Sequence, residues 1–106
     1  MNEICKLDDI IPETGVCALV GGEQVAIFRT QNGDVFAMDN FDPFSQANVI
    51  SRGLLGSCEI DGKKVRYVAS PMYKQRFDLA TGKCLDDERV SLRSYPVSVT
   101  NGVVMI

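Results

Sequence analysis

Short apolar and β-branched runs alternate along this chain with turns that contain glycine. The turns that separate two such runs are Gly21-Gly22, Asn32-Gly33, Asp61-Gly62 and Asn101-Gly102. Asn-Gly and Asp-Gly pairs favour two-residue hairpin turns, because a type I′ turn needs a positive φ at both central residues. The pattern therefore predicts an all-β antiparallel domain, a β-sandwich or partial barrel of roughly eight to ten strands.

The individual runs differ in how they expose their faces. Residues 25–28 are apolar on both faces, which favours a central strand covered on both sides. Residues 95–100 alternate between apolar and polar, which is typical of a half-buried strand, and Pro96 should start that strand or lie at a sheet edge. In residues 65–70, Val65, Tyr67 and Ala69 form one face.

Helix is scarce in the predicted elements. Residues 7–11 can form one turn that Pro12 would stop, and a second short turn is expected within residues 45–55 before Gly53.

Composition narrows the class of protein. The 106 residues suit one domain, residues 1–106, with 45 % hydrophobic residues to form its core. A net charge of −3 argues against nucleic acid as the main partner. The chain has no apolar run of about 18 residues and no signal-peptide pattern at its start, so we expect a cytoplasmic protein with no membrane segment.

The residues available for chemistry are few. The chain has no histidine, which excludes Ser-His-Asp and Cys-His catalysis, and it has no glycine-rich nucleotide loop. None of the four cysteines forms a C-x-x-C pair. Two disulfides are one interpretation of that even number, and reduced, buried thiols are the interpretation we favour in a chain without export signals.

Two loops carry a resemblance to a known family. Residues 69–85 resemble the second half of the Rieske iron–sulfur motif at Pro71, Phe77, Asp78 and Gly82, and residues 37–44 resemble its first half. In a Rieske centre two cysteines and two histidines hold a [2Fe–2S] cluster. Here the residues at the four ligand positions are Asp42, Phe44, Ser70 and Tyr73. The resemblance therefore implies a Rieske-like fold without a cluster, with residues from about 39 to 80 forming the smaller lobe that carries both loops.

Two interpretations of these loops stay open. The loop tips can be a docking surface for a partner, whose candidate residues are Phe41, Phe44, Met72, Tyr73, Lys74 and Arg76. Alternatively, the ligand-position residues fill the space of the missing cluster, and the aromatic and methionine side chains form a small core among themselves. We expect no metal or cofactor on this chain and no catalytic residue.

A closer resemblance, over essentially the whole chain, is to the small-subunit family of bacterial NAD(P)H-dependent nitrite reductases. It is carried by residues 4–10, 12–19, 24–29, 40–44, 51–54, 69–71 and 74–77. The resemblance implies a large-subunit partner that binds NAD(P)H, FAD, sirohaem and a [4Fe–4S] cluster and reduces nitrite to ammonium. It also implies a non-redox role for this chain in assembly or positioning.

Two other functions remain as alternatives. One is a stand-alone Rieske-like module that binds a different protein. The other is a [2Fe–2S] electron-transfer ferredoxin, which would require a bound cluster.

Overall fold

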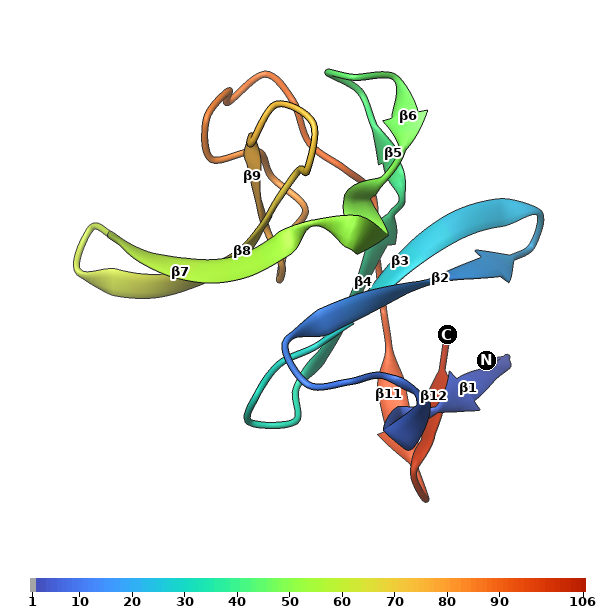
Figure 1. Ribbon diagram of the computed structural model, residues 1–106. Coiled ribbons are helices and arrows are strands. Elements are labelled where there is room, and N and C mark those ends of the chain that lie inside the picture. Colours follow the sequence, from blue (N-terminus) through green and yellow to red (C-terminus); the bar gives the residue numbers. More distant parts are fainter. Residues whose placement is uncertain (1) are drawn as a thin grey trace.

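Twelve short strands and two single turns of 3₁₀ helix make up residues 2–106, the part of the chain that the computed structural model describes (Figure 1). The strands are β1 (Glu3–Lys6), β2 (Thr14–Val20), β3 (Glu23–Arg29), β4 (Val35–Asp39), β5 (Phe41–Asp42), β6 (Ala47–Asn48), β7 (Leu54–Ile60), β8 (Lys63–Ala69), β9 (Arg76–Asp78), β10 (Ser94–Tyr95), β11 (Ser98–Thr100) and β12 (Val103–Met105). The 3₁₀ turns are η1 (Leu7–Asp9) and η2 (Ile50–Arg52), in the two places where the sequence predicts helix.

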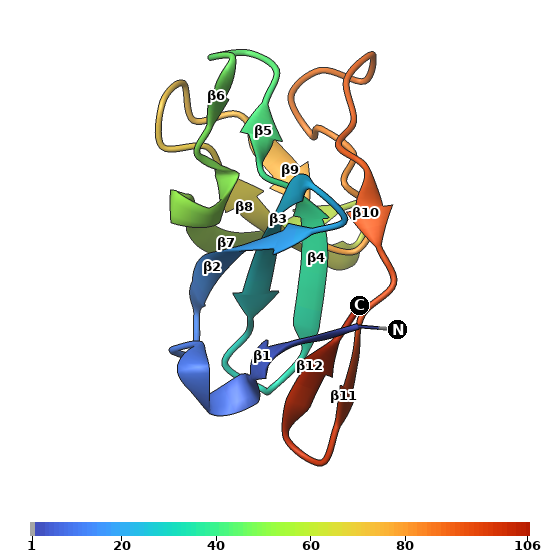
Figure 2. The same cartoon turned by 90° about the vertical axis from the view of Figure 1, so that its right-hand side faces the viewer.

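The strands form antiparallel sheets in three layers. The central sheet has the order β10-β4-β3-β2, and three-stranded sheets β1-β12-β11 and β7-β8-β9 lie on either side of it (Figures 1 and 2). The pair β5-β6 forms a separate small hairpin. This arrangement confirms the predicted all-β, Rieske-like fold. The strand number exceeds the expected eight to ten because β5, β6 and β10 have only two residues each.

The central strand β3 separates two hydrophobic cores. Ala26 and Phe28 face the core beneath β8 and β9, whereas Val25 and Ile27 face the core beneath β12. All four side chains have no solvent exposure, as the run of apolar residues predicts. One strand therefore carries the contacts that join the three layers.

Three of the four predicted turns are two-residue hairpin turns. Gly21-Gly22, Asp61-Gly62 and Asn101-Gly102 have positive φ at both positions. The prediction of a two-residue turn at Asn32-Gly33 was wrong, because this pair lies in a longer loop between β3 and β4 that starts at Thr30. The backbone N–H of Thr30 donates to the carbonyl of Asp34 at 2.8 Å, and this bond closes the loop.

One predicted strand needs correction. Residues 95–100 do not form one strand, because the chain leaves the central sheet after β10 and enters another sheet at β11, with Pro96 between them. The strand predicted around residues 65–69 forms as β8, and Val68, on the face opposite Tyr67, is buried in the core with Phe77.

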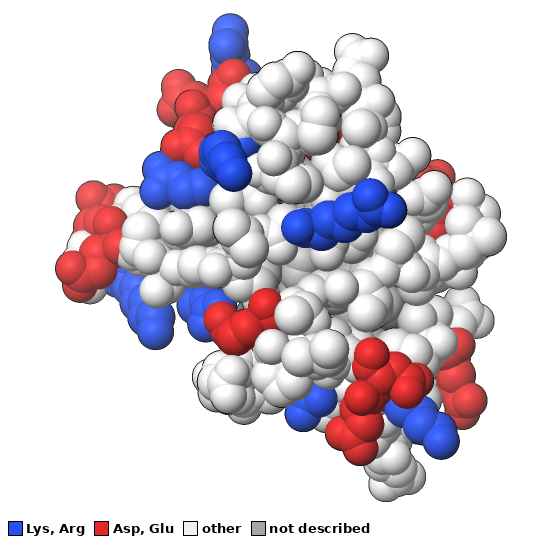
Figure 3. Space-filling view, in the orientation of Figure 1, with Lys and Arg blue, Asp and Glu red and all other residues white. Residues whose placement is uncertain are grey.

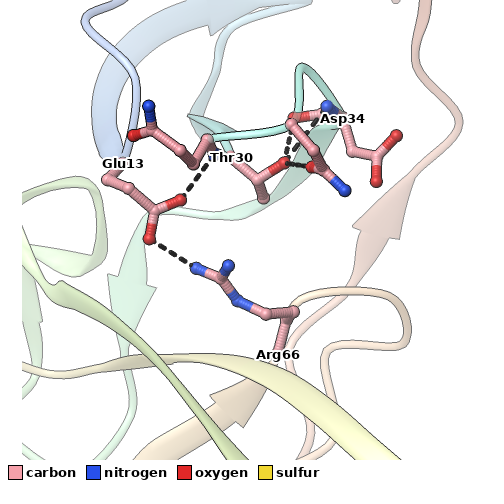
Figure 4. Close-up of polar contacts among 6 residues, drawn as sticks. Glu13, Thr30, Asp34 and Arg66 are labelled. Carbon is pink, nitrogen blue, oxygen red and sulfur yellow. Dashed lines mark hydrogen bonds and ion pairs between the residues drawn. The ribbon is translucent and has the colours of Figure 1, made fainter.

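A polar bridge joins the central sheet to β8 (Figure 4). The Glu13 carboxylate accepts hydrogen bonds from Arg66 Nη2 at 2.7 Å and from the backbone N–H of Gln31 at 2.6 Å. The hydrogen bond from Arg66 lowers the pKa of Glu13 below its usual value. Glu13, directly before β2, has a positive φ of 64°. Its hydrogen bond with Arg66 connects two residues that are 53 positions apart in the sequence.

Candidate docking site at the two loops

The two loops that resemble the Rieske motif lie at the same end of the molecule. The first loop joins β5 to β6, and the second, residues 70–75, joins β8 to β9 (Figures 1 and 2). The backbone N–H of Ser70 donates to the carbonyl of Gln75 at 2.8 Å, which closes the second loop. Lys74 takes up a positive φ of 68° within it.

A buried hydrogen bond connects the loops at the two positions where Rieske proteins have cysteine. The Ser70 hydroxyl donates to Asp42 Oδ2 at 2.5 Å, and neither residue has any solvent exposure. The same carboxylate accepts the backbone N–H of Phe44 and the hydroxyl of Ser45, both at 2.9 Å. Three donors thus satisfy a carboxylate that would otherwise be costly to bury. We call this set of contacts the Asp42–Ser70 latch.

The two positions of the family's histidines have different surroundings. Phe44 is half-buried and packs against the core residue Phe77, with 6.2 Å between ring centroids. Tyr73 is 60 % exposed. Two further docking candidates, Met72 and Phe41, are 52 % and 45 % exposed. The latch and Phe44 therefore fill the interior between the loops, whereas Phe41, Met72 and Tyr73 are exposed to solvent. A docking role for the exposed side chains stays a prediction.

The two basic docking candidates differ in their freedom to bind a partner. Lys74 is exposed. Arg76 is engaged within the chain, because its guanidinium donates to both carboxylate oxygens of Asp86 and lies 5.5 Å from the Tyr67 ring centroid. This contact lowers the pKa of Asp86. Arg76 ties the segment after β9 to the sheet, and its role in docking stays a prediction.

The residues at the ligand positions do not fit a [2Fe–2S] cluster. A carboxylate, a hydroxyl, a phenyl ring and a phenol provide neither the thiolates nor the imidazoles of such a centre. The space between Asp42 and Ser70 is closed by their hydrogen bond. Within residues 2–106 no three Cys, Asp or Glu side chains come together as a metal site. The four cysteines are free thiols, as predicted, but the prediction that they are buried was wrong for three of them: Cys84 is buried, Cys5 and Cys58 are partly exposed, and Cys17 is exposed.

Sequence reasoning missed one residue that positions the first loop. Asn40 is 2 % exposed, and its Oδ1 accepts the backbone N–H of Ser51 at 2.7 Å. Its carbonyl accepts the backbone N–H of Ile50 at 3.1 Å, and its Nδ2 donates to Gln24 Oε1 at 3.0 Å. No signal in the sequence indicated this role, because the short strand β5 that follows Asn40 was not predicted and the burial of Asn40 depends on contacts with Gln24 and Ser51.

Comparison with solved structures defines the class of fold. A ferredoxin of carbazole 1,9a-dioxygenase from Nocardioides aromaticivorans superposes with a TM-score of 0.80 at 21 % identity, over 97 % of this chain and 92 % of that one. The Escherichia coli protein NirD superposes with a TM-score of 0.83 at 53 % identity, over 97 % of this chain and 91 % of that one. The fold is therefore the one found in Rieske-type ferredoxins.

The sequence comparisons are more specific. The whole chain, residues 1–106, matches the family described as Rieske-like [2Fe-2S] domain. The nitrite reductase (NADH) small subunit of Salmonella typhimurium is 55 % identical over 99 % of this chain and 94 % of its own length. The chain thus belongs to the Rieske-like domain family and, within it, to the nitrite reductase small subunits.

A longer relative contains a segment of the same kind. The nitrite reductase [NAD(P)H] large subunit of Klebsiella oxytoca is 45 % identical over 97 % of this chain, which corresponds to 10 % of that protein's length. In that protein, a segment resembling this chain is part of the large subunit itself.

No helix within residues 2–106 is long and apolar enough to cross a membrane.

The predicted boundaries of the smaller lobe, residues 39–80, stay a prediction. Residues beyond that range also pack beside β9, because Phe77 pairs with Cys84 and Lys83 with Ser91.

Proposed function

We propose that this chain is the non-redox small subunit of a cytoplasmic NAD(P)H nitrite reductase and that it supports assembly or activity of the large subunit. Its relatives with this length carry the name of that subunit, with 55 % identity in Salmonella typhimurium. The large subunit would bind NAD(P)H, FAD, sirohaem and a [4Fe–4S] cluster and reduce nitrite to ammonium. This chain would carry none of these groups.

The observation that carries the non-redox role is the Asp42–Ser70 latch. The latch holds the two loops together by a hydrogen bond of 2.5 Å at the positions where a cluster would cross-link them. Loop geometry is thereby preserved by hydrogen bonds among the chain's own residues. A protein that keeps the loops and replaces their ligands is suited to binding through the loops.

The exposed loop residues indicate the surface that binds. Phe41, Met72 and Tyr73 present apolar area to solvent at one end of the molecule, and such side chains are enriched in protein interfaces. The Klebsiella oxytoca relative, in which a similar segment belongs to the large subunit, supports the large subunit as the partner.

Coexpression with the large subunit tests the proposal. We expect the two chains to copurify and the small subunit to raise NADH-dependent nitrite reduction or the stability of the complex. The double variant Met72→Ser/Tyr73→Ser should weaken association, while Ile11→Ser serves as a control because Ile11 is 71 % exposed outside the two loops. Phe44 is kept unchanged, since its contact with Phe77 belongs to the core.

Each outcome separates one part of the proposal. Failure to copurify and an unchanged nitrite assay would overturn the assignment and favour a stand-alone module with a different partner. Association that is insensitive to the double variant would overturn the loop surface alone. A visible iron–sulfur absorbance in the purified chain would favour the ferredoxin alternative.

A further inference from the structure

The turn η2 forms a rigid platform beside the first loop. Ile50 is fully buried, and the Ser51 backbone N–H is bound by the buried Asn40 side chain. Gly53 follows with no room for a side chain, because a Cβ there would lie 2.5 Å from the carbonyl oxygen of Ala69. The backbone on both sides of Arg52 is therefore held by the interior.

Two side chains at this platform are exposed to solvent. Arg52 is exposed, and Leu54, two residues further on, is 71 % exposed. Leu54 pairs with Ala69, directly before the second loop. An exposed arginine and an exposed leucine thus lie on fixed backbone next to the loop surface.

Arg52 differs from the other arginines in its partners. The five arginines at positions 29, 66, 76, 89 and 93 each form an ion pair with an aspartate or glutamate of this chain. Across residues 2–106, Arg52 is the arginine for which the structure shows no such partner. A guanidinium presents paired donors that match a carboxylate, so Arg52 is available for one from outside the chain.

The surface around η2 carries little charge. In Figure 3 the acidic and basic side chains gather mainly along the edges of the molecule, and a broad uncharged area covers its centre and upper right. Among residues 43–54, which include η2, Arg52 is the one charged residue. Arg52 is the basic residue of η2. An isolated positive charge within an uncharged area resembles the centre of a protein interface, where arginine often carries much of the binding energy.

We infer that Arg52 and Leu54 form an anchor that binds a carboxylate, flanked by apolar side chains, on the nitrite reductase large subunit. This inference rests on the proposed function and extends the docking surface from the loop tips to η2. The positive charge of Arg52 indicates the chemistry of the partner group. The chain as a whole has a net charge of −3, so a carboxylate of the partner is attracted where a local basic group is exposed.

Binding measurements with the purified large subunit test the anchor. We expect Arg52→Glu to raise the Kd about tenfold or more, because it places two carboxylates against each other. Arg52→Lys should fall between the wild type and Arg52→Glu, since it keeps the charge and loses the paired donors. The control Lys63→Glu makes the same charge change at the β7–β8 turn, about 20 Å along the hairpin from Leu54, and should leave the Kd within about twofold.

Salt dependence provides a second readout. The Kd of the wild type should rise with salt concentration, and Arg52→Gln should reduce the slope of that dependence because it removes the charge without reversing it. Arg52→Gln also keeps the test valid if Arg52→Glu does not fold, as judged from circular dichroism and thermal unfolding.

The outcomes distinguish this inference from the proposed function. Wild-type binding that is unchanged in both Arg52→Glu and Arg52→Gln would overturn the anchor and leave the proposed function standing. Absence of binding by the wild type would overturn the proposed function and the anchor with it. Equal weakening by Arg52→Glu and Lys63→Glu would show a general charge effect and would also overturn the anchor.

Discussion

At the scale of single residues, a buried carboxylate and a hydroxyl take over the place of two metal-binding thiolates. The Asp42 carboxylate accepts three hydrogen bonds, two of them from within its own loop and one from Ser70 in the other loop. Only the last of these joins the loops. The contribution of that bond can therefore be separated from the local order of the first loop.

Replacing Ser70 with alanine should lower the free energy of unfolding by about 1–3 kcal/mol, because a hydrogen bond to a buried carboxylate is lost. Urea unfolding measures this change. Ser57→Ala, an exposed site on β7, should change the free energy by less than about 0.5 kcal/mol. Equal stability of Ser70→Ala and the wild type would show that the latch adds nothing to stability.

Replacing Gly53 with alanine should also lower the free energy of unfolding. The new Cβ would lie 2.5 Å from both the Ala69 carbonyl oxygen and Val68 Cγ2 on β8, so the connection between η2 and β7 would have to move away from β8. Overpacking of this kind costs about 1–3 kcal/mol or more. Gly21→Asn is a suitable control, since its φ of 57° is one that asparagine tolerates and nothing lies near it. A Gly53→Ala midpoint in urea equal to that of the wild type would contradict the close approach.

The residue types at the loops were predictable from sequence, and their mutual contacts were not. The replacement of all four ligands follows directly from Asp42, Phe44, Ser70 and Tyr73. Their separation into a buried pair, a half-buried ring and an exposed phenol depends on how β5 approaches β8, which involves residues 28 positions apart. Short sequence patterns contain no information on such distances.

At the scale of elements, the Glu13 bridge joins the central sheet to the sheet that contains β8. It links the start of β2 and the loop after β3 to Arg66 on β8 (Figure 4). The two side chains are only partly exposed, at 35 % for Glu13 and 28 % for Arg66. Solvent screening at this exposure keeps the bridge modest, at about 1 kcal/mol.

Removing the Glu13 charge should change how stability depends on pH. The pKa of Glu13 is lowered in the folded chain by Arg66, so the folded state favours the ionised form. The ionised Glu13 carboxylate stabilises the fold fully above the pKa that Glu13 has in the unfolded chain, about 4.3. This stabilisation is lost as the pH falls through the lower pKa that Glu13 has in the folded chain. Glu13→Gln should therefore be less stable than the wild type at pH 7, and the difference should shrink below about pH 4. Thermal unfolding between pH 7 and pH 3 measures this, and a constant difference would contradict it.

The hairpin turns were the most reliable elements to predict from sequence. Three dipeptides formed two-residue turns because glycine, asparagine and aspartate tolerate positive φ. At Asn32-Gly33, hydrogen bonds of the Thr30 side chain favour a longer loop over a two-residue turn. The Thr30 hydroxyl donates to Asn32 Oδ1 at 2.5 Å and accepts the Asp34 backbone N–H at 3.1 Å.

At the scale of the whole molecule, the chain termini and the loops lie apart. The ends of the chain pair with each other, since the backbone N–H of Asn2 donates to Ile106 at 2.6 Å and that of Ile106 to Asn2 at 2.9 Å. In Figure 2 both ends lie with β1 and β12, away from the loops at the top. A connection through a terminus therefore leaves the loop surface open.

A flexible linker that joins either terminus to another protein should preserve binding to the large subunit. An insertion of the same length between Met72 and Tyr73 should abolish binding while the rest of the fold persists, because it falls in the second loop. Copurification of the three forms measures this. Loss of binding in both terminal fusions would contradict the proposed orientation.

The strand β3 has a consequence for how the protein unfolds. Its alternating side chains contribute to both cores, so neither core can open while the other stays intact without exposing half of β3. The amide protons of residues 25–28 should accordingly exchange with solvent only through global unfolding, at the slowest rates in the chain. The loop amides around Met72 should exchange by local opening instead, which would make the docking end adaptable while the two cores behave as one cooperative unit.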